Sequence, residues 1–145
     1  MTRDEIYQLR YYFLSSQPIK LKDLTMNTLK THRDLDVWKL SMDLVIDLYT
    51  ITATFPVSEK FGLVSQIRRA GVSICSNIAE GAARSHFKEF VQFLYISLGS
   101  VAEVETQLDI ALRLNYLQSI ELEKEMLDRI RRMLLGLIRN VTRNA

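Results

Sequence analysis

Residues 63–81, LVSQIRRAGVSICSNIAEG, decide the fold of this chain. Apolar residues recur in this stretch every three or four positions, which is the period of one face of an α-helix. Small residues follow beside that face at every fourth position, where they allow a neighbouring helix to approach closely. We therefore predict a packed helix over about 59–82, with Ser58 as its N-terminal cap and Gly81 at its end. The apolar face comprises Leu63, Ile67, Ala70, Ile74 and Ile78, and the small residues are Gly71, Cys75 and Ala79.

The same period recurs in three further stretches. A helix over about 36–54 ends before Pro56, because the residue before a proline is pushed out of the α region. A third helix runs from a cap at Ser85 to about residue 115, and a fourth runs from a cap at Ser119 almost to the end. Four long helices with short connections predict an all-α fold, an antiparallel up-down-up-down four-helix bundle. The expected core residues are Phe87, Val91, Leu94, Leu98, Val101, Leu108 and Leu112 in the third helix, and Leu127, Ile130, Met133, Leu134, Leu137 and Val141 in the fourth.

Two of these helices carry more apolar surface than one bundle can bury. The first helix has two apolar faces and only a narrow polar strip, and the third has apolar residues well outside its core stripe. We expect either self-association or a cover formed by the N-terminal segment. The two faces of the first helix are Leu35, Trp38, Met42, Val45, Ile46 and Tyr49, and Val37, Leu40, Leu44, Leu48, Ile51 and Phe55; its polar strip is Asp36, Lys39, Asp43, Asp47 and Thr50. The extra apolar surface of the third helix consists of Phe93, Ile96, Gly99, Ala102, Val104 and Ile110.

The composition is that of one ordinary globular domain. The 145 residues are 48% hydrophobic and 25% charged, with a net charge of +2, so disorder and a whole-surface polyanion binder are both disfavoured. The one cysteine, Cys75, excludes an intramolecular disulfide and favours a reducing compartment. No apolar run is long enough for a membrane span, and the N-terminus lacks the pattern of a signal peptide. We expect a cytoplasmic protein without a membrane role.

The N-terminal segment, residues 1–30, differs from the bundle domain, residues 31–145. Ile6, Leu9, Tyr12 and Phe13 predict one short amphipathic helix, which Pro18 would follow. Two interpretations stay open. Translation begins at Met26 and the preceding segment is a start-site artefact, or the segment is a genuine arm that docks on the body.

No catalytic, cofactor or metal site is predicted. His32 and His86 lie near helix ends without a partner at i+3 or i+4, and the Glu-x-x-His pairs of di-iron bundles are missing from the sequence. Phosphate-binding and dinucleotide-binding loops are missing as well. Cys75 lies on the small-residue edge of its helix, which favours a buried structural role over a nucleophile.

A polar stripe follows the helix over 59–82. Its members share an arc of roughly 100° by the helical period. One interpretation is a solvated face. The other is a half-buried seam against another helix or subunit, which short polar side chains suit better than exposed faces usually do. The stripe consists of Gln66, Arg69, Ser73, Ser76, Asn77, Glu80 and Arg84.

Glu105 lies on the predicted core stripe of the third helix, between Val101 and Leu108. A buried carboxylate needs a partner, because removing a bare charge from water is very costly. We therefore predict a buried structural brace. The candidate partners are Arg68, Arg69, Tyr49 and Trp38.

The fourth helix carries the basic concentration of the chain. Arg129, Arg132, Arg139 and Arg143 project from the side opposite its apolar face, and no acidic residue follows Asp128. Acids early and arginines late complement the helix dipole, which is one account of this pattern. The other is a patch that follows the phosphates of a nucleic acid, multiplied where subunits form a ring.

Several motifs together resemble one bacterial family. They are RDLDVW at residues 33–38, Phe55-Pro56-x-x-Glu59, SQIRRA at 65–70, SICSNIAEG at 73–81 and GSVAEVET at 99–106. The chain resembles, over about residues 31–142, the four-helix-bundle proteins encoded in intervening sequences of 23S ribosomal RNA. Cys75 stands where the family often has proline, and residues 1–25 fall outside the pattern.

The resemblance implies a compact bundle that assembles as a homopentamer and has no established enzymatic activity. The family is also similar in fold to the accessory variability protein of diversity-generating retroelements, a basic pentamer that binds nucleic acid and a reverse transcriptase. We therefore expect a non-enzymatic, ring-forming protein that binds structured RNA, such as ribosomal RNA, or a ribonucleoprotein. The alternative is a scaffold or adaptor that binds a partner protein through the polar stripe, with no nucleic-acid role.

Overall fold

The structure is a computed structural model, and it describes residues 31–144. Two short 3-10 helices, η2 (His32–Asp34) and η3 (Val57–Glu59), precede the first two long helices. The predicted N-terminal segment, 1–30, lies outside the described residues. The long helices are α2 (Asp36–Thr52), α3 (Leu63–Ala82), α4 (Phe87–Arg113) and α5 (Glu121–Arg143).

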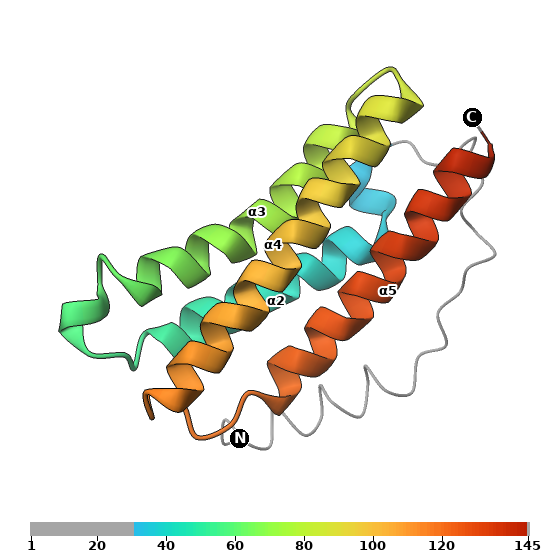
Figure 1. The fold of residues 1–145 in the computed structure, drawn as a ribbon. Coiled ribbons are helices and arrows are strands. Elements are labelled where there is room, and N and C mark those ends of the chain that lie inside the picture. The colour runs from blue at the N-terminus through green and yellow to red at the C-terminus, as the bar shows by residue number, and fades with distance from the viewer. Residues whose placement is uncertain (1–30, 145) are drawn as a thin grey trace.

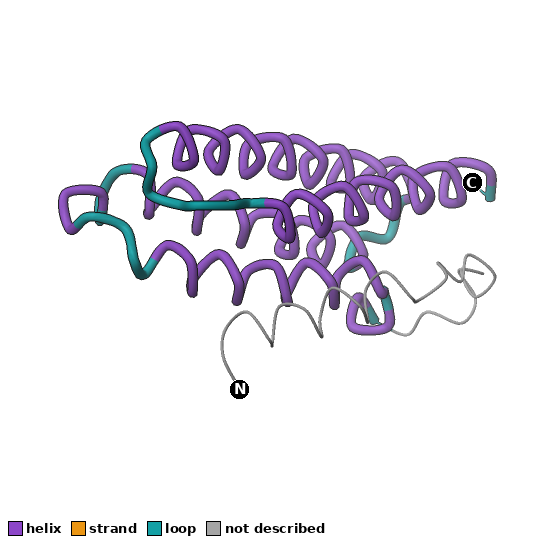
Figure 2. The backbone as a smooth tube through the Cα atoms, turned by 90° about the horizontal axis from the view of Figure 1, so that it is seen from below, coloured by secondary structure: helices purple, strands orange, loops and turns teal. Residues whose placement is uncertain are grey.

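The long helices form one bundle. Helix α2 packs against α3 and α5, and α4 packs against the same two helices. Figures 1 and 2 show consecutive helices running in opposite directions, with the connections at the two ends of the bundle. The predicted all-α, up-down-up-down architecture is confirmed. Within residues 31–144, no helix combines the length and apolar content needed to cross a membrane.

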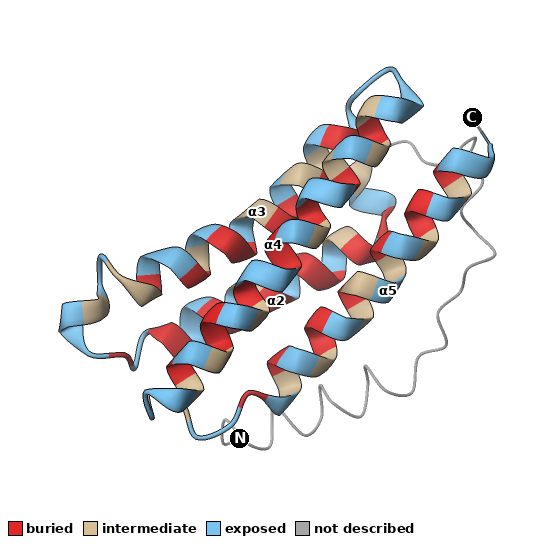
Figure 3. Cartoon of the chain, viewed as in Figure 1, coloured by how far each residue is buried: buried red, intermediate tan, exposed pale blue. Residues whose placement is uncertain are grey.

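Aliphatic side chains from all four helices fill the space between them. Figure 3 shows the buried positions recurring along each helix on the side that faces its neighbours. Each fully buried Leu or Ile contributes about 1.5–3 kcal/mol relative to exposure, so this core is the main source of stability. Its largest fully buried side chains are Leu44, Leu48, Ile51, Ile67, Ile74, Ile78, Leu94, Leu108, Met126, Leu127, Ile130 and Leu134.

Only one of the two apolar faces predicted for α2 lies wholly in the core. On the other face, Met42, Ile46 and Tyr49 are 37%, 59% and 45% exposed. Asp47 was predicted on the solvated strip and is instead buried, with 4% of its surface exposed. The prediction was wrong because Asp47 lies four residues before Ile51, and the helical period turns it toward the bundle.

Helix α4 is rotated relative to its predicted core stripe. Phe87 is largely exposed, whereas Phe90 and Ser97 are buried. The pattern considered apolar residues alone and therefore missed the inward serine. Burial of Ser97 is tolerated because its hydroxyl donates to the Ile74 carbonyl oxygen of α3 at 2.9 Å.

The start of α3 is capped by Glu59 and not by Ser58. The helix begins at Leu63, later than predicted, and its N-cap residue is Gly62, which has no side chain. The Glu59 carboxylate accepts from the Leu63 backbone N–H at 2.8 Å and from the Tyr116 hydroxyl at 3.1 Å. One side chain therefore joins the start of α3 to the α4–α5 connection.

The predicted caps of the two later helices fare differently. Helix α4 has His86 as its N-cap residue and no side-chain cap, so the prediction for Ser85 was wrong. The Ser119 hydroxyl accepts from the Glu121 backbone N–H at 3.3 Å, but the N-cap residue of α5 is Ile120, so the predicted cap lies one residue early. A serine near a predicted helix start is therefore a weak guide to the exact cap in this chain.

Two glycines of α3 allow neighbouring helices to approach closely. A Cβ on Gly71 would lie 2.6 Å from Leu48 Cδ1 of α2, and a Cβ on Gly81 would lie 2.7 Å from Phe93 Cβ of α4. Gly81 is buried within the last turn of α3, so the prediction that it ends the helix was wrong.

The non-glycine residue with a positive φ among those described is Asn115. Its φ is 58°, just after α4, and asparagine tolerates this left-handed conformation.

Candidate nucleic-acid interface

The arginines of α5 lie mostly on the side away from the core. Arg132, Arg139 and Arg143 are exposed, and Arg129 is half-buried. The charge changes sign along the helix: residues 121–128 contain four carboxylates and one lysine, and residues 129–143 contain five arginines and no carboxylate. The side chains buried on the opposite side include Leu127, Ile130, Leu134, Leu137 and Val141.

Some arginines of α5 form ion pairs with carboxylates and others do not. Arg132 lies 3.3 Å from Asp128, one turn earlier. Arg131, which the predicted set did not contain, pairs with Glu105 and lies 3.6 Å from Asp128. Within residues 31–144, Arg139 and Arg143 make no ion pair. Uncompensated positive charge is therefore concentrated in the last two turns of α5.

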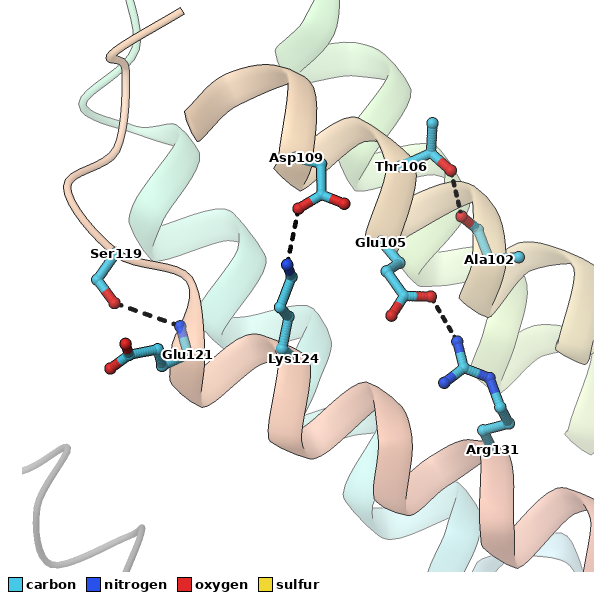
Figure 4. Close-up of polar contacts among 8 residues, drawn as sticks. All are labelled: Ala102, Glu105, Thr106, Asp109, Ser119, Glu121, Lys124 and Arg131. Carbon is cyan, nitrogen blue, oxygen red and sulfur yellow. Dashed lines mark hydrogen bonds and ion pairs between the residues drawn. The ribbon is translucent and has the colours of Figure 1, made fainter. Parts of the chain in front are cut away.

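Glu105 connects α4 to α5. Its carboxylate lies 2.5 Å from the Arg131 guanidinium, and the two side chains are 34% and 32% exposed (Figure 4). The predicted partners were therefore wrong and the carboxylate is only partly buried, because α4 is turned relative to its predicted core stripe and Glu105 faces α5. Lys124 and Asp109 form a second such pair at 2.9 Å (Figure 4). Partly exposed pairs of this kind contribute about 0–1 kcal/mol each.

One predicted partner of Glu105 is occupied elsewhere. The Arg68 guanidinium lies 4.4 Å from the centre of the Tyr49 ring and donates to the Thr52 hydroxyl at 2.9 Å. These contacts tie α3 to α2 on a partly exposed surface. They also cover one side of the Tyr49 ring, which the sequence had placed on a surplus apolar face.

The polar stripe of α3 divides into two parts. Ser73 and Asn77 are half-buried, and the Ser100 hydroxyl of α4 donates to the Ser73 hydroxyl at 2.8 Å. The Asn77 amide donates to the Ser73 carbonyl oxygen at 2.8 Å and to its hydroxyl at 3.0 Å. This part is a seam within the subunit, between α3 and α4.

The other part of the stripe is a solvated face. Glu80 and Arg84 form an exposed pair at 2.5 Å, and the Arg84 guanidinium lies 4.9 Å from the centre of the Phe93 ring. The interpretations of the stripe as seam and as solvated surface thus each describe some of its members. Its exposed members are Gln66, Arg69, Ser76, Glu80 and Arg84.

Groups that could support catalysis are scattered. No cluster of three or more His, Cys, Asp or Glu side chains within residues 31–144 could hold a metal ion. Burial raises the pKa of the Cys75 thiol, an effect that backbone hydrogen bonds partly oppose. The ring of His32 packs edge-on against Trp38 with 5.1 Å between centroids.

Comparisons with known proteins identify one family. The model of the family described as 23S rRNA-intervening sequence protein matches residues 33–136. Among solved structures, the chain is similar to a protein of unknown function from the S23 ribosomal protein family of Bacteroides thetaiotaomicron. The two are 24% identical with a TM-score of 0.64, over 71% of this chain and 95% of that one, a likeness that establishes the fold alone. None of the curated proteins matches the chain.

Proposed function

The chain belongs to the family of 23S rRNA-intervening sequence proteins, and from that premise we propose that it is a non-enzymatic, self-assembling bundle protein that binds structured RNA or a ribonucleoprotein in the cytoplasm. The observation that carries the proposal is the exposed arginine side of α5, where Arg139 and Arg143 have no carboxylate partner within residues 31–144. The family's description names an intervening sequence of ribosomal RNA, so a ribosomal RNA fragment is the first RNA to test.

The chemistry of these side chains suits phosphate. A guanidinium stays charged at all physiological pH values and presents a planar set of donors that matches two phosphate oxygens. Each phosphate contact releases condensed counterions, so binding weakens as salt rises. Near-neutral net charge does not oppose this interaction, because the acids of α5 lie on its first two turns and the arginines on the remainder.

Self-assembly into a ring is supported by where the exposed apolar side chains lie. Met42 and Ile46 are exposed on α2, and Tyr95, Ile96 and Ile110 are exposed on α4. Both helices pack mainly against α3 and α5 and therefore lie diagonally across the bundle. Two different exposed apolar surfaces on opposite sides of a subunit favour a head-to-tail contact, which forms a ring when the rotation from one subunit to the next closes. The homopentamer implied by the resemblance is one such ring.

RNA binding is tested with a charge-reversal variant. Binding of the full chain to a labelled ribosomal RNA hairpin is measured by fluorescence anisotropy between 50 and 200 mM salt. We expect Arg139→Glu/Arg143→Glu to abolish it. The control, Lys60→Glu/Arg113→Glu, reverses two other exposed cations with the same change in net charge. No binding by the wild type at low salt, or equal binding by both variants, would contradict the proposal.

Assembly is tested by light scattering on the purified chain. We expect a mass several times that of the 16.8 kDa subunit, and five times if the ring is a pentamer. Replacing Ile46 and Ile96 by Asp should reduce the mass toward that of one subunit while leaving the helical circular dichroism unchanged. A wild type that is monomeric at micromolar concentration would show that the exposed apolar side chains do not form an interface.

The alternative function is protein binding through the exposed part of the α3 stripe. The observation that favours it is the exposed Glu80–Arg84 pair one turn beyond Ser76, a polar surface that the ion pairs of α5 do not touch. Under this alternative, Glu80→Lys abolishes capture of a partner protein and RNA does not bind. Asn77 is a poorer site for this test, because its amide is engaged within α3.

A further inference from the structure

Several charged elements meet at one end of the bundle. Because consecutive helices are antiparallel, the last turns of α5 finish where α2 begins and where the chain turns from α3 into α4 (Figure 1). The 3-10 helix η2 lies at the same end, in contact with α2 and α3. We call this region the α5-terminal end. Residues that are distant in sequence, near 33, 88 and 140, are thereby brought to one end of the molecule.

Four cations at the α5-terminal end lack a carboxylate partner within residues 31–144. Arg139 and Arg143 lie on the last turns of α5, and Lys88 lies on the first turn of α4. Arg33 of η2 is exposed, and its guanidinium lies 5.6 Å from the centre of the Trp38 ring. Contact with the ring holds Arg33 in place without neutralising its charge.

Most acids near this end are already engaged. Asp36 pairs with Lys39 at 3.2 Å, and Glu80 pairs with Arg84 at 2.5 Å. Asp34 accepts from the Thr31 backbone N–H at 3.0 Å in a capping box. The opposite end of α5 is acidic, with four carboxylates over residues 121–128. Along α5 itself, phosphates are therefore favoured at the α5-terminal end over the first two turns of the helix.

We propose that the phosphates of a structured RNA bind at the α5-terminal end, on Arg33, Lys88, Arg139 and Arg143 together, and that Arg132 takes no part. This inference rests on the proposed RNA-binding function and specifies its surface. Arg132 is set apart because it lies three turns before the end of α5 and because its guanidinium is 3.3 Å from the Asp128 carboxylate. Arg33 and Lys88 lie within residues 33–136, the range that the family model matches, and Arg139 and Arg143 lie beyond it.

The arrangement suits a folded RNA better than a single strand. The four cations come from three separate elements around the end of the bundle, η2, α4 and α5. Double-stranded RNA is recognised largely by its shape and by 2′-hydroxyl and phosphate contacts across its minor groove. Cations on three separate elements can contact phosphates that a folded RNA holds apart.

The magnitude follows from counterion release. Each phosphate contact contributes about 0.9 to the slope of log K against log salt, so four contacts correspond to a loss of about 100-fold or more between 50 and 200 mM salt. Removal of one contact should lower the slope by about 1 per subunit engaged and weaken binding about 5–10-fold at 100 mM salt.

The decisive variants lie outside α5. With the full chain and a labelled ribosomal RNA hairpin, we expect Arg33→Gln and Lys88→Gln each to weaken binding about 5–10-fold and to lower the salt slope by about 1. Arg132→Gln, the matched control within α5, should leave both quantities unchanged. Circular dichroism melts establish that every variant is folded.

The outcomes separate this inference from the function on which it rests. If Arg139→Gln/Arg143→Gln weakens binding while Arg33→Gln and Lys88→Gln do not, the chain binds RNA through α5 alone. That result overturns the proposal that the α5-terminal end is the binding surface. An effect of Arg132→Gln equal to that of Arg139→Gln also overturns it. No binding by the wild type at 50 mM salt overturns both proposals, as does binding to phosphatidylserine vesicles in place of RNA.

Discussion

Replacement of Glu59 by alanine should destabilise the bundle, although Glu59 lies in a surface connection. The substitution removes two acceptors at once: Oε2, which caps the Leu63 N–H at 2.8 Å, and Oε1, which receives the Tyr116 hydroxyl at 3.1 Å. The first bond fixes where α3 begins. The second ties the α2–α3 connection to the α4–α5 connection, where the Phe55 and Tyr116 rings lie 5.4 Å apart.

The expected loss is the sum of two modest terms. Removal of a side-chain helix cap costs about 0.5–2 kcal/mol, and loss of a partly buried hydrogen bond costs about 0.5–1.5 kcal/mol. Glu59→Ala should therefore lower the free energy of unfolding by about 2 kcal/mol. In a domain of this size such a loss corresponds to a fall in Tm of about 6 °C. Tyr116→Phe removes only the second bond and should cost about 1 kcal/mol.

Chemical denaturation followed by circular dichroism measures these values, at one fixed protein concentration because self-association would shift the apparent stability. Ser58→Ala is the matched control. Ser58 precedes Glu59 and was the cap expected from sequence, but α3 begins at Leu63 with Glu59 as its acceptor. We expect Ser58→Ala to change stability by less than about 0.5 kcal/mol. Equal losses for Ser58→Ala and Glu59→Ala would refute the capping assignment.

Two further predictions concern buried positions of α3. Gly71→Ala should destabilise the bundle by about 1–3 kcal/mol, because the new Cβ would meet Leu48 Cδ1 at 2.6 Å. The control in the same denaturation assay is Gly99→Ala on α4. It should be neutral or stabilising by up to about 1 kcal/mol, because the space around Gly99 is open. Cys75 should react slowly with iodoacetamide at pH 8 in the folded protein and quickly in guanidinium chloride. Burial raises the pKa of its thiol, so little of the reactive thiolate is present in the folded protein. Mass spectrometry measures the alkylation rate in both states. Equal alkylation rates in the two states would show that the thiol is accessible.

The fold could be predicted from sequence because its main determinant is periodic. Ile67, Ile74 and Ile78 recur at helical spacing, and all three are fully buried in the structure. The helix starts could not be predicted as well. The cap of α3 is a carboxylate four residues upstream of the helix, across a 3-10 turn, and Glu59 reaches Leu63 only after the connection has folded. A serine just before an apolar run carried the stronger local signal.

The charge pairing of α5 depends on how the helices pack, which the helical period of the sequence does not show. Spacing alone placed the arginines opposite the apolar side, and the structure has Arg132, Arg139 and Arg143 exposed. The pairing of Arg131 with Glu105 depends on the orientation of α4, in which Ser97 faces inward, and a pattern of apolar residues does not specify that orientation. Which arginines remain unneutralised therefore becomes visible only when the helices are packed.

The surfaces proposed for assembly and for RNA do not compete. The most exposed apolar side chains of α2 and α4 include Ile46 and Ile96, whereas the unpaired arginines lie on α5, which packs against both of those helices. If α2 of one subunit meets α4 of the next, the outward side of α5 stays uncovered in every subunit. The α5-terminal ends of the subunits are then related by the ring's symmetry axis. Salt-dependent contacts add along a polyanion, so such a ring would convert a few cations per subunit into a continuous phosphate-binding surface. Variants that break the ring should therefore lose RNA affinity although every arginine is still in place.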